Sequence, residues 1–286
     1  MSELVIRRGT GTVLTDIDPR SRTGWSWTGL TVVELDDQPY PVGSQGREYV
    51  VVPLAAPGWT LRTAAGEQRL TGRASVFEPL GDCAYIGAGQ QVEVTGPGRL
   101  AIASAPTEEQ YPVAVIRPEQ VAVAARGAGT MSRLVRGITL GSGFTGFARV
   151  LVCEVVTPGG NWSSYPAHKH DQHTETEREL EEIYYYELSD GPGGQPGFGY
   201  HQTTSTDPAR PVDILTEVRS GDTVLVPYGW HGPCTAAPGH DMYYLNVMAG
   251  PATDRQWLIT DHPEQTWVRD LWPGLALDPR IEEKLR

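Results

Sequence analysis

The chain has 286 residues, enough for one large domain or two of ordinary size, and 39% hydrophobic with 20% charged residues allows a buried core. A net charge of −12, with only two lysines, excludes the basic surface that a nucleic-acid binder needs and favours a small-molecule partner. No apolar run of roughly 18 residues occurs, and the opening MSELVIRRG lacks a signal-peptide core. We therefore expect a cytoplasmic protein with no membrane partner.

Short strands dominate the elements predicted in chain order. The 33 glycines and 23 prolines are typical of many turns between strands. Stretches rich in β-branched and apolar residues predict strands at 49–54, 92–104, 148–156, 223–227 and 242–248. Two short helices are expected, at 118–125 and in the charged run 174–180. This pattern predicts an all-β protein built as a sandwich or barrel.

A weak internal repeat indicates two such units. The segment that opens at Gly72 and ends with Tyr85-Ile-Gly-Ala-Gly89 has the rhythm of GDTVLVPYG at 221–229, a Gly-opened strand that leads to a Gly-containing turn. The strand pattern pauses at PTEEQYP, residues 106–112. We therefore place the first domain at 1–115 and the second at 116–286.

Histidine is confined to the second half of the chain. All seven histidines follow residue 167: His168, His170, His173, His201, His231, His240 and His262. The three cysteines are far apart and form no CxxC pair, so they predict neither a disulfide framework nor a thiolate metal site. A metal site based on imidazole must therefore lie in the second domain.

The spacing of three of these histidines predicts a metal site. His168 and His170 are two residues apart, so on a strand both rings point to the same side. Downstream, LEEIYYY opens a strand with carboxylates at Glu181 and Glu182, and His231 follows a Pro/Gly turn. Three imidazoles and one carboxylate suit a divalent transition metal and leave positions open for a substrate. We expect Glu182 to be the carboxylate ligand and Glu181 to face away from the ion.

These motifs resemble the cupin superfamily, whose strands carry HxH with a later Glu, then G-x5-P-x-G and a His. Three longer segments resemble the 5-deoxyglucuronate isomerase family of inositol catabolism: GGNWSSYPAHKHD at 159–171, LEEIYYY at 180–186 and APGHDMYYLNVMAG at 237–250. The likeness extends loosely to 24–30, 126–136 and 267–269. It implies a bicupin, with two tandem cupin barrels (double-stranded β-helices), the first without metal ligands. The histidine-free first half agrees with this.

The resemblance implies a metal-dependent aldose–ketose isomerase that converts 5-deoxy-D-glucuronate into 5-dehydro-2-deoxy-D-gluconate through an enediol. We expect one divalent ion, zinc before manganese, iron or nickel, because one ligand set serves several metals. The reaction also needs a general base whose pKa lies near neutral pH. Glu182, Tyr184 and Tyr186 are candidates by position, since alternate residues of one strand share a face.

Further residues have less specific signals. Arginine matches a carboxylate in geometry, so Arg126, Arg133 and Arg136 are candidates to bind the substrate acid, with a surface salt bridge as the equal alternative for each. Asp171 could orient a ligand histidine. His173 and His201 are expected in surface or loop positions, and His240 and His262 stay unassigned.

Other ligand and function assignments remain open at this point. Glu175 could replace Glu182 as the ligand, as a cupin isomerase of a pectin-derived 5-keto-4-deoxyuronate would require. A cupin dioxygenase would use iron in the same ligand set. A sugar-binding cupin would bind without turnover. Cupin strands often meet in dimers, so a homo-oligomer is also expected.

Overall fold

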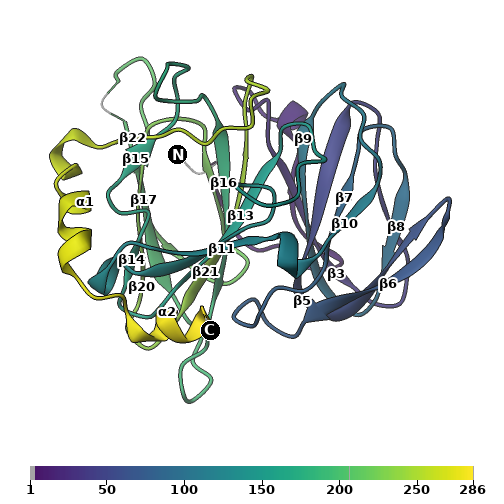
Figure 1. Cartoon of the computed structure of the whole chain (residues 1–286), viewed down its shortest axis with the longest axis horizontal. Coiled ribbons are helices and arrows are strands. Elements are labelled where there is room, and N and C mark those ends of the chain that lie inside the picture. Colours follow the sequence, from purple (N-terminus) through teal and green to yellow (C-terminus); the bar gives the residue numbers. More distant parts are fainter. Residues whose placement is uncertain (1–3, 206, 286) are drawn as a thin grey trace.

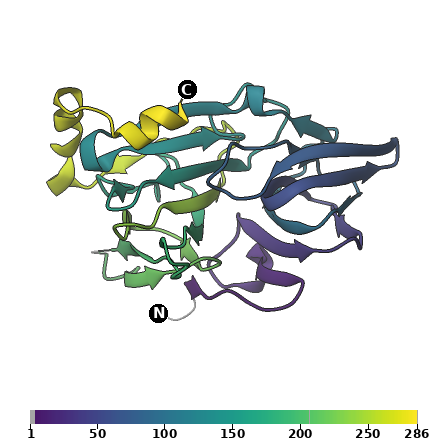
Figure 2. The same cartoon turned by 90° about the horizontal axis from the view of Figure 1, so that it is seen from below.

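The computed structural model describes residues 4–205 and 207–285. Its strands form two bodies that lie side by side, the first drawn in purple to blue and the second mainly in green (Figures 1 and 2). The strands up to residue 116 are β1 Val5–Ile6, β2 Val13–Ile17, β3 Gly29–Leu35, β4 Tyr40–Val42, β5 Arg47–Thr63, β6 Gly66–Arg73, β7 Cys83–Ile86, β8 Val92–Thr95, β9 Gly98–Pro106 and β10 Ala114–Ile116. The later strands are β11 Ala122–Arg126, β12 Arg133–Gly137, β13 Leu151–Thr157, β14 Trp162–Ser163, β15 His168–Lys169, β16 Glu181–Leu188, β17 Gly199–Thr204, β18 Asp213–Val218, β19 Thr223–Val226, β20 Trp230–Ala236, β21 Met242–Ala249 and β22 Thr260–Asp261.

The α-helices are short and lie at the C-terminal end, against the outer side of the second body, whereas 3-10 turns occur along the whole chain (Figure 1). The α-helices are α1 Val268–Leu271 and α2 Pro279–Lys284, with 3-10 turns η1 Pro19–Ser21, η2 Pro118–Gln120, η3 Gly129–Met131, η4 Pro263–Gln265 and η5 Trp272–Gly274. α2 begins where Asp278 accepts the backbone N–H of Arg280 at 2.9 Å and Pro279 takes the first helical position. Within the described residues, no helix has the length and apolar character to cross a membrane.

Three sheets build the two bodies, and the all-β prediction is confirmed. A nine-stranded sheet with the order β10-β7-β5-β9-β3-β2, joined by β4, β6 and β8, makes the first body. The second has a seven-stranded sheet, β1-β19-β16-β21-β13-β12-β11, opposite a six-stranded sheet, β18-β17-β20-β15-β22 with β14. The N-terminal strand β1 pairs with β19 and thereby belongs to the second body's sheet. The chain changes sheet between β10 and β11.

The seven-stranded sheet is buried on both faces. Alternate residues of a strand point to opposite sides. On β16, Tyr184 and Tyr186 therefore belong to the core inside the second barrel, while Ile183 and Tyr185 pack in a core shared with the first body. This explains why β16 and β21 are buried at every position and carry apolar or aromatic residues on both faces.

Buried carboxylates fasten the two bodies to each other. Glu181 of β16 accepts the backbone N–H groups of residues 26, 27 and 28 at 2.6–3.2 Å. Reciprocally, Glu48 of β5 accepts those of residues 148, 149 and 150 at 2.7–2.8 Å. Hydrogen bonds to a charged group contribute about 1.5–3 kcal/mol each, so both clusters favour one fixed arrangement of the two bodies. Glu181 thus faces the first body, away from the histidines, as its place in the strand predicted.

A third link is an ion cluster around Glu154 on β13. Its carboxylate accepts two hydrogen bonds from Arg73 of the first body, at 2.7 and 3.0 Å, and one from Arg136 at 2.6 Å. The Tyr243 hydroxyl donates a fourth at 3.1 Å. Glu154 is 1% exposed, so these partners replace water completely.

Both helix predictions in mid-chain are wrong. Residues 118–125 form the turn η2 and the start of β11, because β11 pairs with β12 along its whole length. Residues 174–180 form an irregular loop, since the N–H groups of Arg178 and Leu180 donate to the carbonyls of Leu258 and His170, outside the segment, instead of to helical partners. The strand predicted at 92–104 is two strands, β8 and β9, separated by a turn at Gly96 with φ of 127°.

The internal repeat is real in topology but starts at another glycine. In the first body β7 pairs with β5, and in the second β19 pairs with β16 in the same way. The last residue of β7, Ile86, lies opposite Tyr49, and the last residue of β19, Val226, lies opposite Glu182. Gly81 precedes β7 at the same distance as Gly221 precedes β19. Gly81 therefore corresponds to Gly221, and Gly72, which lies in β6, does not.

Candidate functional site

Three histidine rings meet inside the second barrel. His168 on β15 lies directly opposite His231 on β20, and His170 follows two residues after His168. Their ligand nitrogens all lie within 4.8 Å of one another, and all three side chains are buried. The HxH spacing thus brings both of its rings to the third, as expected for neighbours on one face of a strand.

Glu182 joins this cluster from the facing sheet. Its Oε2 lies 2.9 Å from His170 Nε2 and 3.1 Å from His231 Nε2. Glu175, the alternative ligand, is exposed in the loop after β15. The strand position of Glu182, alternate to Glu181, therefore places it with the rings.

Backbone carbonyls set the orientation of each ring. The Nδ1 atoms of His168, His170 and His231 lie 3.3, 3.0 and 3.1 Å from carbonyl oxygens. A carbonyl can only accept, so these nitrogens donate, and a neutral ring then carries a lone pair at Nε2. The buried Nε2 of His231 lies 3.1 Å from Glu182 Oε2 but lacks the alignment of a hydrogen bond. Burial alone would lower the pKa of His170, but Glu182, 2.9 Å from its Nε2, raises it overall. In their neutral form the three rings offer lone pairs beside one carboxylate, so this donor set fits a metal ion.

Burial and the neighbouring side chains together set the charges of His168 and Glu182. It lowers the pKa of His168 well below the usual value, and the neighbouring rings lower it further, so His168 is neutral and able to bind a metal. Burial alone would raise the pKa of Glu182, but His170 and His231 beside it lower it overall. An ionised carboxylate with a neutral imidazole is the ligand form that a divalent ion requires.

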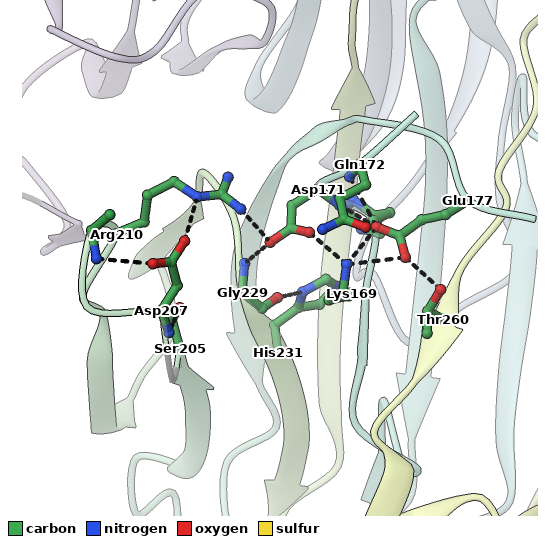
Figure 3. Close-up of polar contacts among 12 residues, drawn as sticks. Lys169, Asp171, Gln172, Glu177, Ser205, Asp207, Arg210, Gly229, His231 and Thr260 are labelled. Atoms are coloured by element: carbon green, nitrogen blue, oxygen red, sulfur yellow. Dashed lines mark hydrogen bonds and ion pairs between the residues drawn. The ribbon is translucent and has the colours of Figure 1, made fainter. Parts of the chain in front are cut away.

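A buried polar network behind the rings holds the loops that carry them (Figure 3). Lys169 donates to Asp171 at 2.7 Å and to Glu177 at 2.8 Å, and Glu177 also accepts from Thr260. Asp171 accepts the N–H of Gly229 at 3.0 Å, and the carbonyl of Gly229 accepts from His231. Asp171 thus reaches His231 of the cluster through one intervening residue.

A small cavity opens beside the cluster, with a volume of about 40 Å³. Its walls come from β11, β12, β13, β16 and β21 and from the segments around residues 164 and 257. The lining residues are Arg126, Arg133, Val135, Leu140, Cys153, Val155, Ser164, His168, Glu182, Tyr184, Tyr244, Asn246, Met248 and Trp257.

Two of the three predicted arginines reach this cavity. Arg126 and Arg133 lie opposite each other on β11 and β12. Arg133 is buried and donates only to the carbonyls of Met131 and Tyr165, at 3.1 and 3.4 Å, with no carboxylate partner among the described residues. Burial lowers the pKa of Arg133 to about 10. Arg136 points to the opposite side of β12, where it pairs with Glu154, so we leave it out of the proposed substrate site.

Tyr184 and Tyr186 differ in position although both are fully buried on the inner face of β16. Tyr184 lines the cavity, and its hydroxyl lies 3.3 Å from Ser164 Oγ. Ser164 has φ of 48°, an uncommon value for a residue with a side chain. The Tyr186 hydroxyl instead lies 2.6 Å from His201 Nδ1 and 3.2 Å from Cys234 Sγ, deeper in the barrel.

The prediction for His201 is wrong, because this ring lies in the barrel core. It is fully buried on β17, between Tyr186 and Thr203, whose Oγ1 is 2.8 Å from Nε2. Burial lowers the pKa of His201 to about 3, so the ring is neutral. The alternation of GYHQTT, which faces His201 and Thr203 inward, was the available signal.

The other histidines lie outside the cluster. His173 is exposed in the loop after β15. His240 lies 2.9 Å from the carbonyl of Ser189. His262 accepts the N–H of Glu264 at the start of η4.

The two-barrel fold and the convergent donor set define a bicupin with a candidate metal centre in its second barrel. The sequence profile of the KduI/IolB family matches residues 2–268, and the chain belongs to this family. The resemblance to 5-deoxyglucuronate isomerases is thereby confirmed.

Relatives named 5-deoxy-glucuronate isomerase match the chain. The protein from Geobacillus kaustophilus (strain HTA426) is 42% identical over 198 residues, which cover 68% of this chain and 65% of that relative, just under two thirds of its length. The protein from Listeria monocytogenes serovar 1/2a is 32% identical over 266 residues, 90% of this chain and 92% of the relative.

Solved structures support the fold. An IolB-like protein from Salmonella typhimurium LT2 superposes with a TM-score of 0.84 at 33% identity, over 93% of this chain and 99% of its own. An oxalate decarboxylase from Lactobacillus farciminis has a TM-score of 0.59 at 9% identity, over 98% of this chain and 95% of its own. This second likeness shows the fold alone. Together they confirm two cupin units, although the sheets are not closed.

Proposed function

We propose that this chain is a metal-dependent aldose–ketose isomerase that converts 5-deoxy-D-glucuronate into 5-dehydro-2-deoxy-D-gluconate. One observation carries the proposal: a donor set that fits a cation shares a cavity with a buried arginine that has no carboxylate partner among the described residues. A cation held by the donor set would suit the aldehyde and its neighbouring hydroxyl. The arginine would suit the carboxylate at the other end of a uronate. The names of the relatives agree with this substrate.

His168, His170, His231 and Glu182 would hold the ion. When bound, it would polarise the aldehyde and stabilise the negative charge of the enediol oxygens. Zinc is our first proposal for its identity, and metal analysis of the purified protein against manganese, iron and nickel tests it. A role in inositol catabolism and a cytoplasmic location belong to the same proposal.

The remaining residues bind and orient the substrate. Arg133 and Arg126 would bind the carboxylate, which fixes the direction in which the sugar acid lies. Burial raises the pKa of Tyr184 well above its usual value, so its hydroxyl stays protonated at neutral pH. Tyr184 is therefore able to donate a hydrogen bond to a substrate oxygen and unsuited to act as the base.

The experiment follows 5-deoxyglucuronate by proton NMR with metal-loaded and chelator-stripped protein. In the reaction, the proton on the hydroxyl-bearing carbon moves to the former aldehyde carbon, and a ketone with a hydroxymethyl group results. We expect the hydroxymethyl signal to grow with metal-loaded protein, to be absent after stripping and to return when a divalent metal is added. No turnover by the loaded protein would refute the substrate, and turnover unaffected by stripping would refute the role of the metal.

A further inference from the structure

A strap of chain outside the strand ladders forms one wall of the cavity. Residues 250–259 connect β21 to β22 without helix or strand. Side chains fasten its middle: Arg178 pairs with Asp254 at 2.6 Å, and Arg255 donates to two backbone carbonyls at 2.9 and 3.1 Å. Between these contacts and β22, the strap presents Trp257 to the cavity.

Trp257 lies between the arginines and the histidines. Its ring centroid is 4.5 Å from Arg126 Cζ, close enough for a cation–π contact. The same ring meets the edge of His168, with centroids 6.0 Å apart. Because Arg126 lies opposite Arg133 in the strand ladder, these three side chains surround one corner of the cavity.

The indole N–H of Trp257 has no hydrogen-bond acceptor among the described residues. Its nitrogen is buried, and no described residue accepts from it. A buried donor without an acceptor costs about 1–3 kcal/mol, so such groups in a cavity indicate an acceptor that arrives with a ligand. Tryptophan can only donate, which excludes a cationic or purely donating ligand group.

We propose that Trp257 is a substrate-binding residue whose N–H donates to the carboxylate of the uronate, as the third arm of a subsite with Arg126 and Arg133. The inference rests on the proposed function for the identity of the substrate. A carboxylate has room for this hydrogen bond, since its two oxygens offer about four acceptor positions. The two guanidinium groups beside the indole select an anion over a neutral hydroxyl. Trp257 is therefore a determinant of selectivity for an acid over a neutral aldose.

The test compares Trp257→Phe, which keeps an aromatic ring but removes the N–H, with wild type. Trp59→Phe is the matched control, since Trp59 also has a buried N–H without a described acceptor but lies in the first barrel. All three metal-loaded proteins are titrated calorimetrically with 5-deoxyglucuronate and with the neutral aldose that has a hydroxymethyl group in place of the carboxylate. Turnover of the acid is measured by NMR in parallel.

Loss of one charge-assisted hydrogen bond predicts affinity for the acid that is about 10- to 100-fold weaker in Trp257→Phe, with unchanged affinity for the neutral aldose. Trp59→Phe is expected to bind both as wild type does. Unchanged affinity for the acid, or an equal loss for both ligands, would overturn the proposal. If wild type binds the acid in a Trp257-dependent way without converting it, the isomerase assignment fails and the subsite stands. If wild type does not bind the acid, both fail.

Discussion

Replacing Glu154 by Gln should weaken the whole fold, because this carboxylate compensates two buried arginines. Its partners Arg73 and Arg136 have side chains only 1% and 8% exposed, and Arg73 comes from the other barrel. Glutamine keeps the shape but removes the negative charge between two guanidinium groups. Breaking a buried pair in this way costs about 3–5 kcal/mol.

This loss of about 3–5 kcal/mol in the free energy of unfolding corresponds to a Tm lowered by roughly 6–20 °C, at about 2–4 °C per kcal/mol for a chain of this size class. Differential scanning calorimetry and urea unfolding would measure it. Glu67→Gln is the matched control: Glu67 pairs with Arg62 at 3.1 Å, but both side chains are more than half exposed. Exposed pairs of this kind contribute little to stability, so this variant should melt close to wild type.

Acidification supplies a second check on Glu154. Burial alone would raise its pKa, but Arg73 and Arg136 lower it overall, below the ordinary value of 4.5. The stabilisation is therefore present above that value and is lost as the pH falls through the lower folded-state pKa. The difference in stability between wild type and Glu154→Gln should shrink on acidification. A Glu154→Gln protein that melts with wild type at pH 7 would refute the reasoning.

Three further outcomes follow from the site and the interface. His170→Ala should lose bound metal, from about one ion per chain to a small fraction by elemental analysis, with unchanged circular dichroism; full occupancy would contradict its role as a ligand. Arg133→Gln should lower kcat/KM about 10- to 100-fold, mainly through KM, in the NMR assay, and a fall in kcat alone would argue against binding of the carboxylate. Glu181→Gln should lower the free energy of unfolding by about 1.5–3 kcal/mol in urea, because charge-assisted hydrogen bonds to three N–H groups of the first barrel weaken. An unchanged midpoint would show that these contacts do not couple the barrels.

Local periodicity explains why sequence could find the histidine cluster. A two-residue spacing puts His168 and His170 on one face of any extended segment, and the same rule separates Glu182 from Glu181. These relations hold before the chain folds, because they depend on backbone geometry alone. The strands could be predicted for the same reason, because β-branched stretches bounded by turn residues favour extended backbone locally.

Partners across the fold lie outside the reach of such rules. Arg133 and Arg136 look alike in sequence, but one faces the cavity and the other the Glu154 cluster, and only the packing of one barrel against the other decides which face is which. His201 is different, because the alternation along β17 already indicates that its ring faces inward.

The sequence by itself determined the all-β class, the barrel that holds the histidines and the spacing of the ring ligands, because each follows from short-range geometry and residue chemistry. Only the tertiary structure decided that Arg136 serves the interface, that the run 174–180 is a loop tied by Glu177, and that Trp257 closes the cavity. These outcomes depend on contacts between residues far apart in the chain, and their free energies arise only when distant strands come together.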